Sequence, residues 1–356
     1  MSAGTLVVGT INSGASAPLV LQSNNTTALT LDTSQNATFA GTAAMSSSFK
    51  RNRIINGNYA TDQRNAGAAQ TITAGAALAY TVDRFYAYCT GANVTGQQVA
   101  GATANQYRYQ FTGAASVTAI NFAQRIEALN CADLAGTTAT LSVDLANSLL
   151  TTVTWTAYYA NTTNTFGTLA SPTVTSIATG TFTVSSTVTR YNVQIAIPSA
   201  ATTGLQIVLS VGAQTSGTWT IGNVQLEVGT KATPYEMQIY SDQLAQCQRY
   251  YQTSYFGSGS AVGAATTINS VFYTVWANTN YAFATLSYPV VMRASPTFVS
   301  YSPNSGASGV QYNTSNGDQS ATAPGAGNWA FTNQITNTAA TAGQNYRFHW
   351  SASAEL

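Results

Sequence analysis

The sequence predicts an all-β protein with a single helix. Apolar residues alternate with Thr, Ser, Asn and Gln in many short runs separated by turn residues, which is the pattern of strands with one buried face. The 356 residues are 45% hydrophobic and 11% aromatic, enough for a sizeable core, yet only 6% are charged, against about 25% in an ordinary soluble domain. Because charge usually protects exposed edge strands, we expect the edges to be closed by association of several copies.

Residues 1–48 are expected to form a separate N-terminal segment built from short β repeats. Leu19–Leu21, Leu29–Asp32 and Thr38–Ala40 are short alternating runs separated by Asn and Ser residues, as in strands joined by turns. The segment holds too few large apolar residues for a core of its own. It would therefore be stable only when wound around copies of itself or docked on a partner, and a flexible linker is the alternative.

Residues 49–238 are predicted to form a jelly-roll β-sandwich. The first β run, Ile54–Tyr59, is broken by an Asn-Gly turn. Further strand-like runs follow at 80–88, 106–111, 139–145, 153–159, 181–184, 191–195, 205–211 and 219–227. Short strands at regular spacing with turn residues between them fit a sandwich or jelly roll.

One helix is predicted in the connecting segment 239–256, from Ser241 to Gln252. Four residues recur at the spacing of one helical face: Leu244, Cys247, Gln248 and Tyr251. Ser241 suits the N-cap, and the acid after it suits the first turn. We expect this helix to be a packed connector.

Residues 257–356 are predicted to form a smaller C-terminal β-sandwich, the tip domain. Its strand-like runs are 270–276, 280–286, 296–299 and 345–352. Ser302–Gly327 is rich in Gly, Ser and Asn, and we expect it to be a long exposed loop.

Several function classes have no support in the sequence. A net charge of +1 offers no basic patch to a nucleic acid or to an anionic membrane surface, and no apolar run is long enough for membrane insertion. Cys89, Cys131 and Cys247 are widely spaced, which argues against a zinc site and against a disulfide framework. We expect no cofactor, no metal and no nucleic-acid partner; a structural calcium ion would need carboxylate oxygens, and the sequence has few acidic residues and no dense Asp cluster.

The first residues lack the basic and apolar regions of a secretory signal. We therefore expect the protein to be assembled in a cytoplasm. A composition typical of exposed surfaces, without a signal, is what a virion component released by lysis would have.

The acidic residues have simpler interpretations than catalysis. A glycosidase needs two carboxyl groups about 5–9.5 Å apart. Asp83 beside Arg84 is expected to form a buried ion pair, and Arg125 and Glu127 are expected on one face of a strand. We predict that the protein is not an enzyme, and Glu127 and Asp144 would be the first residues to substitute if polysaccharide were cleaved.

His349 is the only histidine, so a hydrolase triad would depend on it alone. It lies between Phe348 and Trp350 in the last strand-like run, and no Gly-x-Ser-x-Gly elbow accompanies it. We expect a packing or surface role.

Aromatic residues are the most informative class for a ligand. The flat C–H faces of sugars stack on Trp and Tyr rings, while amides and hydroxyls bond the sugar hydroxyls without the desolvation cost of charges. The glycan-binding candidates are Trp155, Tyr158, Trp276, Trp329 and Tyr346, with Tyr159 and Tyr281 as further aromatic candidates. Because an alternating aromatic usually faces a core, we expect one of the two faces of the Trp155–Tyr159 run to be buried. Trp329 is the best single candidate for an exposed contact.

Several stretches resemble tailed-bacteriophage tail fibre proteins. RNRIINGNYATDQRNAG (51–67) and YTVDRFYAY (80–88) resemble the opening of a jelly-roll module of these fibres, and residues 221–254, with QLE, TPYE and CQRYY, resemble its close and the helix that follows. YPVVMRASPT (288–297) is similar to the C-terminal domain that often follows the module, and TALTLDTSQNATFAGT (27–42) is similar to fibre-shaft repeats. The opening and closing strands are also similar to carbohydrate-binding modules with a jelly-roll fold.

The resemblance implies a virion fibre protein whose jelly roll and tip domain are displayed outward. We assign structural roles to six residues: Asp83, Arg84, Trp219, Glu227, Cys247 and Tyr251. The function predicted is non-catalytic adhesion of a homotrimer to host surface polysaccharide or lipopolysaccharide, with the N-terminal segment bound to other virion proteins. The alternatives are a structural virion protein (a head fibre, decoration or baseplate component) and a polysaccharide depolymerase.

Overall fold

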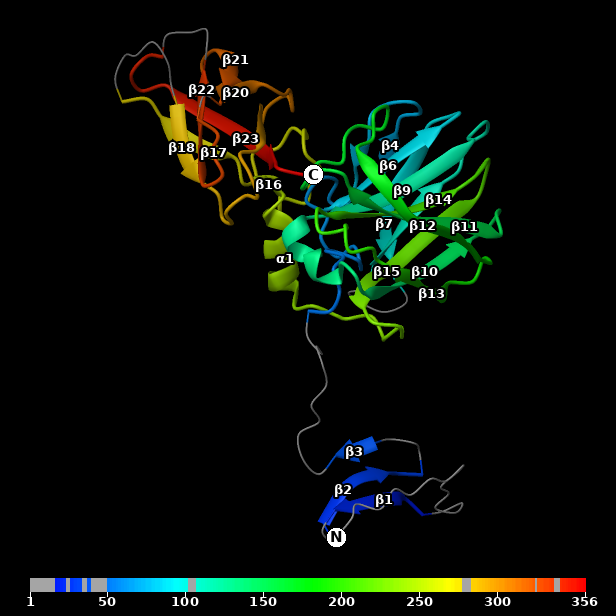
Figure 1. The fold of residues 1–356 in the computed structure, drawn as a ribbon. Coiled ribbons are helices and arrows are strands. Elements are labelled where there is room, and N and C mark those ends of the chain that lie inside the picture. The colour runs from blue at the N-terminus through cyan, green and yellow to red at the C-terminus, as the bar shows by residue number, and fades with distance from the viewer. Residues whose placement is uncertain are drawn as a thin grey trace. The chain divides into compact units, whose positions relative to one another are not determined.

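The computed structural model describes residues 17–23, 26–33, 37–39, 50–101, 107–276, 283–323, 325–335 and 340–356. The chain divides into two compact units, Met1–Lys50 and Arg51–Leu356 (Figure 1). Within the described residues there are 23 strands, one α-helix and two short 3₁₀ helices. This confirms the prediction of an all-β protein with one helix.

The first unit contains a three-stranded antiparallel sheet. Its strands are β1 (Leu19–Ser23), β2 (Thr26–Leu31) and β3 (Ala37–Phe39), in that order. No side chain whose burial is described in this sheet is buried, and Val20 and Leu21 are 40% and 45% exposed. Because a small sheet needs a covered hydrophobic face to be stable, this one requires a further surface against its apolar residues.

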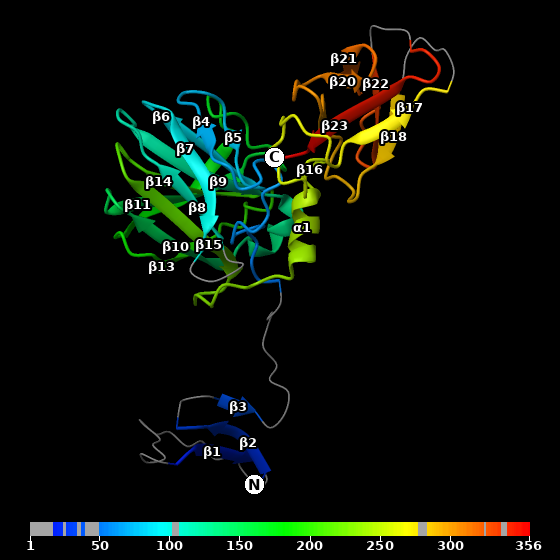
Figure 2. The same ribbon diagram turned by 180° about the vertical axis from the view of Figure 1, so that it is seen from behind.

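Two six-stranded antiparallel sheets face each other at the start of the second unit (Figures 1 and 2). Sheet I has the order β13-β10-β15-β8-β7-β4, and sheet II has the order β12-β11-β14-β9-β6-β5. Sheet I consists of β4 (Gln70–Ile72), β7 (Val94–Ala100), β8 (Tyr107–Thr112), β10 (Thr138–Asn147), β13 (Thr189–Ala196) and β15 (Thr218–Val228). Sheet II consists of β5 (Ala79–Tyr80), β6 (Phe85–Thr90), β9 (Ala119–Ile126), β11 (Thr152–Ala160), β12 (Val174–Thr183) and β14 (Leu205–Val211). This is the predicted β-sandwich.

The core of the sandwich is rich in aromatic rings. Phe85 of β6 stacks on Phe122 of β9 with ring centroids 4.9 Å apart. Trp219 of β15 is fully buried and stacks on Phe111 of β8 at 5.4 Å. Phe111 also packs on Phe122 at 5.3 Å, so the rings join strands of both sheets into one interior.

The run Ile54–Tyr59 is not a strand but a series of turns. Asn56 has a φ of 61°, and its side-chain amide donates hydrogen bonds to the main-chain oxygens of Thr61 at 2.8 Å and Asp83 at 3.0 Å. Because Asn tolerates this left-handed conformation and can bond locally, the apolar pattern of the run does not produce a ladder.

The helix α1 (Tyr240–Gln248) is shorter than predicted. Its N-cap residue is Ile239 and not Ser241, and no side chain caps it. Tyr251 lies beyond the helix, in the strand β16 (Tyr251–Thr253). The predicted helical face was therefore wrong at its last member.

The buried face of α1 is polar. Gln243 and Cys247 are its buried residues, and the amide of Gln243 donates to the side-chain oxygens of Asn56 at 2.6 Å and Asn58 at 2.8 Å. The helix thus docks on the turns after residue 54 through amides, which an apolar periodicity does not reveal.

The remainder of the second unit is a curled eight-stranded sheet around β23 (Asn345–Ser353). Its other strands are β16, β17 (Val271–Thr274), β18 (Phe283–Ser287), β19 (Thr297–Tyr301), β20 (Val310–Asn313), β21 (Gly317–Thr322) and β22 (Ala330–Ile335). Phe331 of β22 packs on Trp350 of β23 at 5.0 Å. The sheet closes on its own small core, as predicted for a second, smaller sandwich.

Ser302–Gly327 was expected to be a loop, and this is wrong, because it contains the paired strands β20 and β21. Gln311 and Asn313 of β20 are fully buried. Amide side chains occupy the inward positions, where the strand pattern has apolar residues. The pattern of apolar residues therefore did not identify this strand.

Candidate functional site

A groove lies on the outer face of sheet II. In β6, Phe85 belongs to the sandwich core, whereas Tyr86 belongs to a separate cluster on the other face, because successive side chains of a strand point to opposite sides. The groove has a volume of about 170 Å³. It is lined by Tyr86, Tyr88, Arg125, Tyr158, Phe166, Thr168, Leu169, Pro172, Val174, Gln206 and Val208.

Strand pairing brings the floor of the groove together from four neighbouring strands. Tyr158 of β11 lies opposite Gln206 of β14, and Gln206 lies opposite Arg125 of β9. In the next row along the strands, Val208 of β14 and Tyr86 of β6 lie on either side of Ala123 of β9. The floor is thus set by the register of sheet II and not by a loop.

The wall of the groove is the loop between β11 and β12, residues 161–173. The loop folds back on itself through a bridge between Gly167 and Pro172. Gly167 has a φ of 72°, and a Cβ there would lie 2.3 Å from the main-chain oxygen of Ser171. Only glycine fits this position, so the sequence of the loop fixes the shape of the wall.

Arg125 forms the charged end of the groove and is only 6% exposed. Its Nε donates to Oε1 of Gln206 at 3.2 Å, Nη1 to the main-chain oxygen of Leu356 at 2.7 Å and Nη2 to that of Gly167 at 3.1 Å. The guanidinium also lies 5.1 Å from the ring of Tyr86. These contacts from three directions hold the side chain in one orientation.

The groove offers the chemistry that a sugar requires. Tyr88 and Tyr158 are partly exposed rings, and Tyr88 stacks beside Tyr86 at 6.4 Å. Burial raises the pKa of Tyr86 and of Tyr88, so both hydroxyls remain protonated at neutral pH. Two rings, an amide and a fixed guanidinium can stack on a sugar ring and bond its hydroxyl groups.

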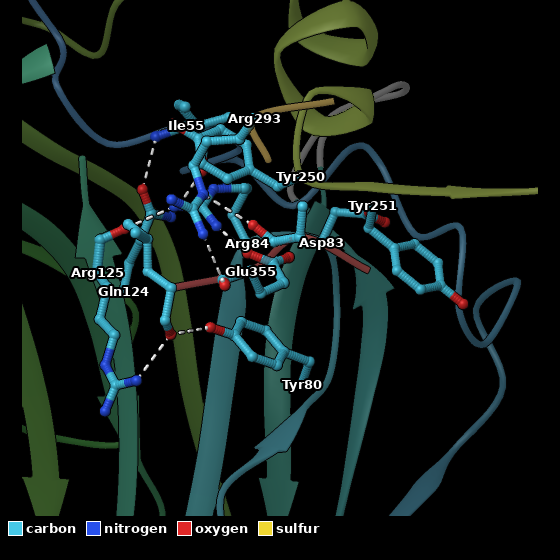
Figure 3. A network of polar contacts seen from close by, with 12 residues as sticks. Ile55, Tyr80, Asp83, Arg84, Gln124, Arg125, Tyr250, Tyr251, Arg293 and Glu355 are labelled. Atoms are coloured by element: carbon cyan, nitrogen blue, oxygen red, sulfur yellow. Dashed lines mark hydrogen bonds and ion pairs between the residues drawn. The ribbon is translucent and has the colours of Figure 1, made fainter. Parts of the chain in front are cut away.

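A buried polar network lies beside this groove (Figure 3). Arg84 forms an ion pair with Glu355, and its Nη2 donates to the main-chain oxygen of Arg125 at 2.6 Å. Its guanidinium carbon lies 3.5 Å from the centroid of the Tyr250 ring. Because Arg84 is only 1% exposed, these contacts replace its hydration shell.

A second arginine shares the same carboxylate. Arg64 lies 3.2 Å from Oε1 of Glu355 and 3.6 Å from Oδ1 of Asp83, and its guanidinium carbon lies 3.5 Å from the centroid of the Tyr251 ring. Asp83 also accepts hydrogen bonds from the main chain and side chain of Gln63 at 2.6 and 2.8 Å. The network therefore joins the sandwich to the end of the curled sheet.

Asp83 and Arg84 are both buried, but they do not pair with each other, which corrects the expectation. They are the two central residues of a turn closed by a hydrogen bond from the amide of Phe85 to the carbonyl of Val82. Arg84 has a φ of 71°, so the two side chains diverge. Each finds its partner in a distant segment instead.

The contribution of Asp83 to the free energy of unfolding should fall as the pH rises from about 4 to about 7. Burial raises the pKa of Asp83 to about 7, against about 3.9 in an unfolded chain. In this window the folded chain keeps a proton that the unfolded chain has released, so the free energy of unfolding decreases with pH, on the order of 1 kcal/mol per pH unit. Asp83→Asn, which mimics the protonated acid, should remove this slope in urea titrations at several pH values.

His349 provides the opposite contribution, because burial lowers its pKa and its stabilising effect is lost as the pH falls. The comparison must therefore be the difference between Asp83→Asn and the wild type at each pH. A difference that does not change between pH 4 and 7 would contradict the prediction for Asp83.

Two of the predicted glycan-binding residues are buried, and for them the expectation is wrong. Trp155 is 6% exposed and faces the core, with its ring against Gly180, where a Cβ would lie 2.8 Å away. Tyr346 is fully buried and stacks on Tyr273 at 5.5 Å. Neither ring can offer a face to a sugar.

The other candidates whose burial is described are partly or fully at the surface, except Tyr159. Tyr158 lines the groove, while Trp276 and Trp329 are 93% and 69% exposed. Tyr159 points into the sandwich and packs on its core, and Tyr281 lies outside the described residues. The structure therefore places only Tyr158 within the groove.

The residues assigned structural roles occupy the interior. Glu227 is buried and accepts hydrogen bonds from the amide of Thr233 at 2.9 Å and its hydroxyl at 2.7 Å, which holds the segment after β15. Cys247 packs with Tyr250 and Ile55. Tyr251 lies under Arg64 in the polar network.

The two carboxylates considered for catalysis are each held in an ion pair. Glu127 pairs with Arg249 at 3.0 Å and accepts a hydrogen bond from Tyr250 at 2.7 Å. Asp144 pairs with Arg190 at 3.0 Å. Glu127 does not share a strand face with Arg125, because β9 ends at Ile126 and a 3₁₀ helix (Ala128–Asn130) follows.

His349 is fully buried and stacks on Tyr255 with centroids 4.0 Å apart. Its Nε2 lies 2.9 Å from the main-chain oxygen of Thr266 and its Nδ1 lies 2.9 Å from Oγ of Ser254. Because a carbonyl can only accept, Nε2 carries the proton and Nδ1 accepts from the serine hydroxyl. This is a packing role, as expected.

The three cysteines are buried free thiols. Burial raises the pKa of Cys131 to about 12 and also raises the pKa values of Cys89 and Cys247, so their thiols stay protonated and unreactive. Among the described residues no group of acidic, His and Cys side chains could hold a metal, and no helix is long and apolar enough to cross a membrane.

Sequence reasoning missed Tyr88, Arg125 and Gln206 as members of one site. Tyr86 and Tyr88 alternate with core residues, so their shared outward face could have been inferred once β6 was recognised. Strand β9, which carries Arg125, was not predicted at all. No signal along the chain shows that these three residues are neighbours, because their strands are far apart in sequence.

Comparison with known proteins gives only weak likenesses. No family model and no curated protein matches the chain. Among solved structures, it is similar to the enzymatically active domain of tailspike protein 4 of bacteriophage CBA120, with 17% identity and a TM-score of 0.30, over 50% of this chain and 21% of that one. It is also similar to a carbohydrate-binding module in complex with β-1,4-galactotriose (11% identity, TM-score 0.30, 51% of this chain and 100% of that one).

A third likeness is to the family 11 carbohydrate-binding module of Clostridium thermocellum in complex with a β-1,3-1,4-mixed-linked tetrasaccharide (12% identity, TM-score 0.29, 46% of this chain and 98% of that one). The chain thus spans about a fifth of the length of the tailspike structure and nearly all of the two modules.

Proposed function

We propose that this protein is a non-catalytic glycan-binding fibre component of a bacteriophage virion, which acts as a homotrimer on host surface polysaccharide or lipopolysaccharide. The observation that carries the proposal is the groove on sheet II. It places the partly exposed rings of Tyr88 and Tyr158 beside Gln206 and a fixed Arg125. These are the groups that stack on sugar rings and bond their hydroxyls.

The trimer and the virion location are supported by the first unit and by the composition. A three-stranded sheet that leaves Val20 and Leu21 exposed gains stability when copies or virion partners cover it. With only 6% charged residues, the chain also lacks the usual protection of edge strands against pairing. Three weak sites on one body would bind a repetitive glycan surface with high avidity.

The absence of catalysis is part of the proposal. Glu127 and Asp144 each pair with a different arginine in the structure, so both carboxylates are engaged in structural contacts. Incubation with host polysaccharide should therefore release no new reducing ends.

The same exposed sheet would also serve a structural virion protein that binds only other virion proteins. The two functions differ in whether the purified protein binds host cells. Light scattering should give three times the chain mass of 37.1 kDa in either case.

Tyr158→Ala and Tyr88→Ala should each weaken binding to host polysaccharide by about fivefold, because each removes a ring worth roughly 1 kcal/mol of stacking. Calorimetry or surface binding of the purified protein would measure this. Trp276→Ala is the matched control, since it removes an aromatic ring that is 93% exposed and outside the groove.

Unchanged affinity in both tyrosine variants would refute the groove as the binding site. If Trp329→Ala weakened binding instead, the contact would lie in the part of the chain that forms the curled sheet. This would agree with the sequence analysis, in which Trp329 is the best single candidate for an exposed contact.

A further inference from the structure

A second cavity, of about 340 Å³, lies in the curled sheet and is not part of the groove. Its polar lining consists of Thr266, Thr267, Asn304, Thr314, Tyr312 and Arg347. Three hydroxyls, an amide, a phenol and one guanidinium thus surround an open space.

A row of side chains crosses the sheet at this cavity. Phe272 of β17 lies opposite Arg347 of β23, and Arg347 lies opposite Tyr312 of β20. Residues directly opposite in antiparallel strands point to the same face. The guanidinium carbon of Arg347 lies 5.1 Å from the Phe272 ring, which is 52% exposed, so one side of the charge is covered by an aromatic ring.

No described carboxylate forms an ion pair with Arg347. No carboxylate of the described chain lies within 4.0 Å of it, and its Nε is buried without a hydrogen-bond partner there. Asp318 lies opposite Tyr312 in the same row, but its two oxygens accept from Ser302 at 2.6 Å and Ser305 at 2.5 Å. A guanidinium with unused donors beside an open cavity is suited to a carboxylate or a phosphate.

The loop of this cavity that carries Thr266 is held in place by His349. The main-chain oxygen of Thr266 accepts a hydrogen bond from Nε2 of His349, and His349 is itself held by Ser254 and by stacking on Tyr255. The loop that presents the hydroxyls of Thr266 and Thr267 is therefore fixed to β23, the strand that carries Arg347.

We propose that this cavity binds the anionic group of an acidic saccharide, a carboxylate or a phosphate. Arg347 supplies the opposite charge, the ring of Tyr312 packs on the sugar, and the threonine hydroxyls bond its hydroxyl groups. This site goes beyond the function proposed above, because it lies on another sheet and selects for charge, and it does not depend on the groove.

Another arginine offers an internal comparison. Arg108 lines a cavity of about 250 Å³ on the outer face of sheet I, and that cavity also contains hydroxyl and amide groups. No aromatic ring is among its lining residues. It therefore lacks the surfaces on which a sugar ring would stack, and we do not expect it to bind the same ligand.

The test is calorimetry of the full chain with three probes: a glucose trisaccharide, the same trisaccharide with a terminal glucuronic acid, and a phosphorylated form. The wild type should bind at least one acidic probe through this cavity, and raising the salt concentration should weaken that binding. Arg347→Gln should weaken acidic binding at least tenfold and leave the neutral probe unchanged. Arg347→Lys should retain part of it, and Tyr312→Ala should weaken it without removing the charge.

Arg108→Gln and Tyr158→Ala are the controls, and neither should change acidic binding through this cavity. Preference for the glucuronic acid probe would indicate an acidic polysaccharide, and preference for the phosphate would indicate a phosphorylated core saccharide. Acidic binding that survives both Arg347→Gln and Tyr312→Ala in folded protein, that is lost equally in Arg108→Gln, or that does not occur at all, would overturn the proposal. Loss of binding of the neutral trisaccharide in Tyr158→Ala would support the groove as a binding site and would leave the proposal for this cavity unchanged.

Discussion

Glu355→Ala lowers the free energy of unfolding by about 3–5 kcal/mol, which is the cost of removing one partner from a buried ion pair. The side chain of Glu355 is 4% exposed, and it is shared by Arg84 and Arg64, whose side chains are 1% and 10% exposed. Without the carboxylate, two buried cations lose their closest countercharge, and neither can reach water. Urea unfolding followed by tryptophan fluorescence measures the loss.

Asp133→Ala is the matched control for this substitution. Asp133 also pairs with an arginine, Arg53, at 2.5 Å, but its side chain is 58% exposed, and exposed pairs contribute roughly 0–1 kcal/mol. Glu355→Gln keeps the shape and one acceptor oxygen, so its cost should fall between the two. Equal losses in Glu355→Ala and Asp133→Ala would mean that the buried network does not stabilise the fold.

Trp219→Ala lowers the free energy of unfolding by about 3–5 kcal/mol, the range for truncation of a large buried aromatic residue. Trp219 is fully buried and stacks on Phe111 across β15 and β8. Its removal leaves a cavity between the sheets that the strands cannot close without losing their register. Urea unfolding of the folded variant measures the change.

Trp219→Phe keeps a buried aromatic ring but removes the indole N–H, so it separates the two contributions. The indole Nε1 of Trp219 is buried and has no hydrogen-bond partner in the described structure, so losing it removes an unfavourable group. We expect this variant to cost about 1 kcal/mol, and Trp276→Ala, at a 93% exposed position, to cost less than about 0.5 kcal/mol. A Trp219→Ala loss as small as that of Trp276→Ala would contradict the assignment of this ring to the core.

The strands that were predicted from the sequence have apolar inward residues. The run 205–211 matches β14 to the residue, and the run 153–159 lies within β11. Strand β20 was missed because Gln311 and Asn313 take its inward positions. Local patterns thus identify strands only where the interior is apolar.

The candidate site was predictable in its chemistry and not in its position. Tyr158 was among the aromatic candidates, but Trp155, three residues earlier, turned out to face the core. Which face of β11 is covered depends on the sheet order β12-β11-β14-β9-β6-β5. That order joins strands from residue 79 to residue 211, and no spacing along the chain encodes it.

The contacts of Glu355 have a consequence for the order of folding. Glu355 lies 291 positions after Arg64 and 271 positions after Arg84 in the sequence. During synthesis, which proceeds from the N-terminus and lets early domains fold first, the sandwich can form while these two arginines still lack their carboxylate. The charge balance of the sandwich interior is therefore completed only after residue 355, which follows the last strand of the curled sheet, has left the ribosome.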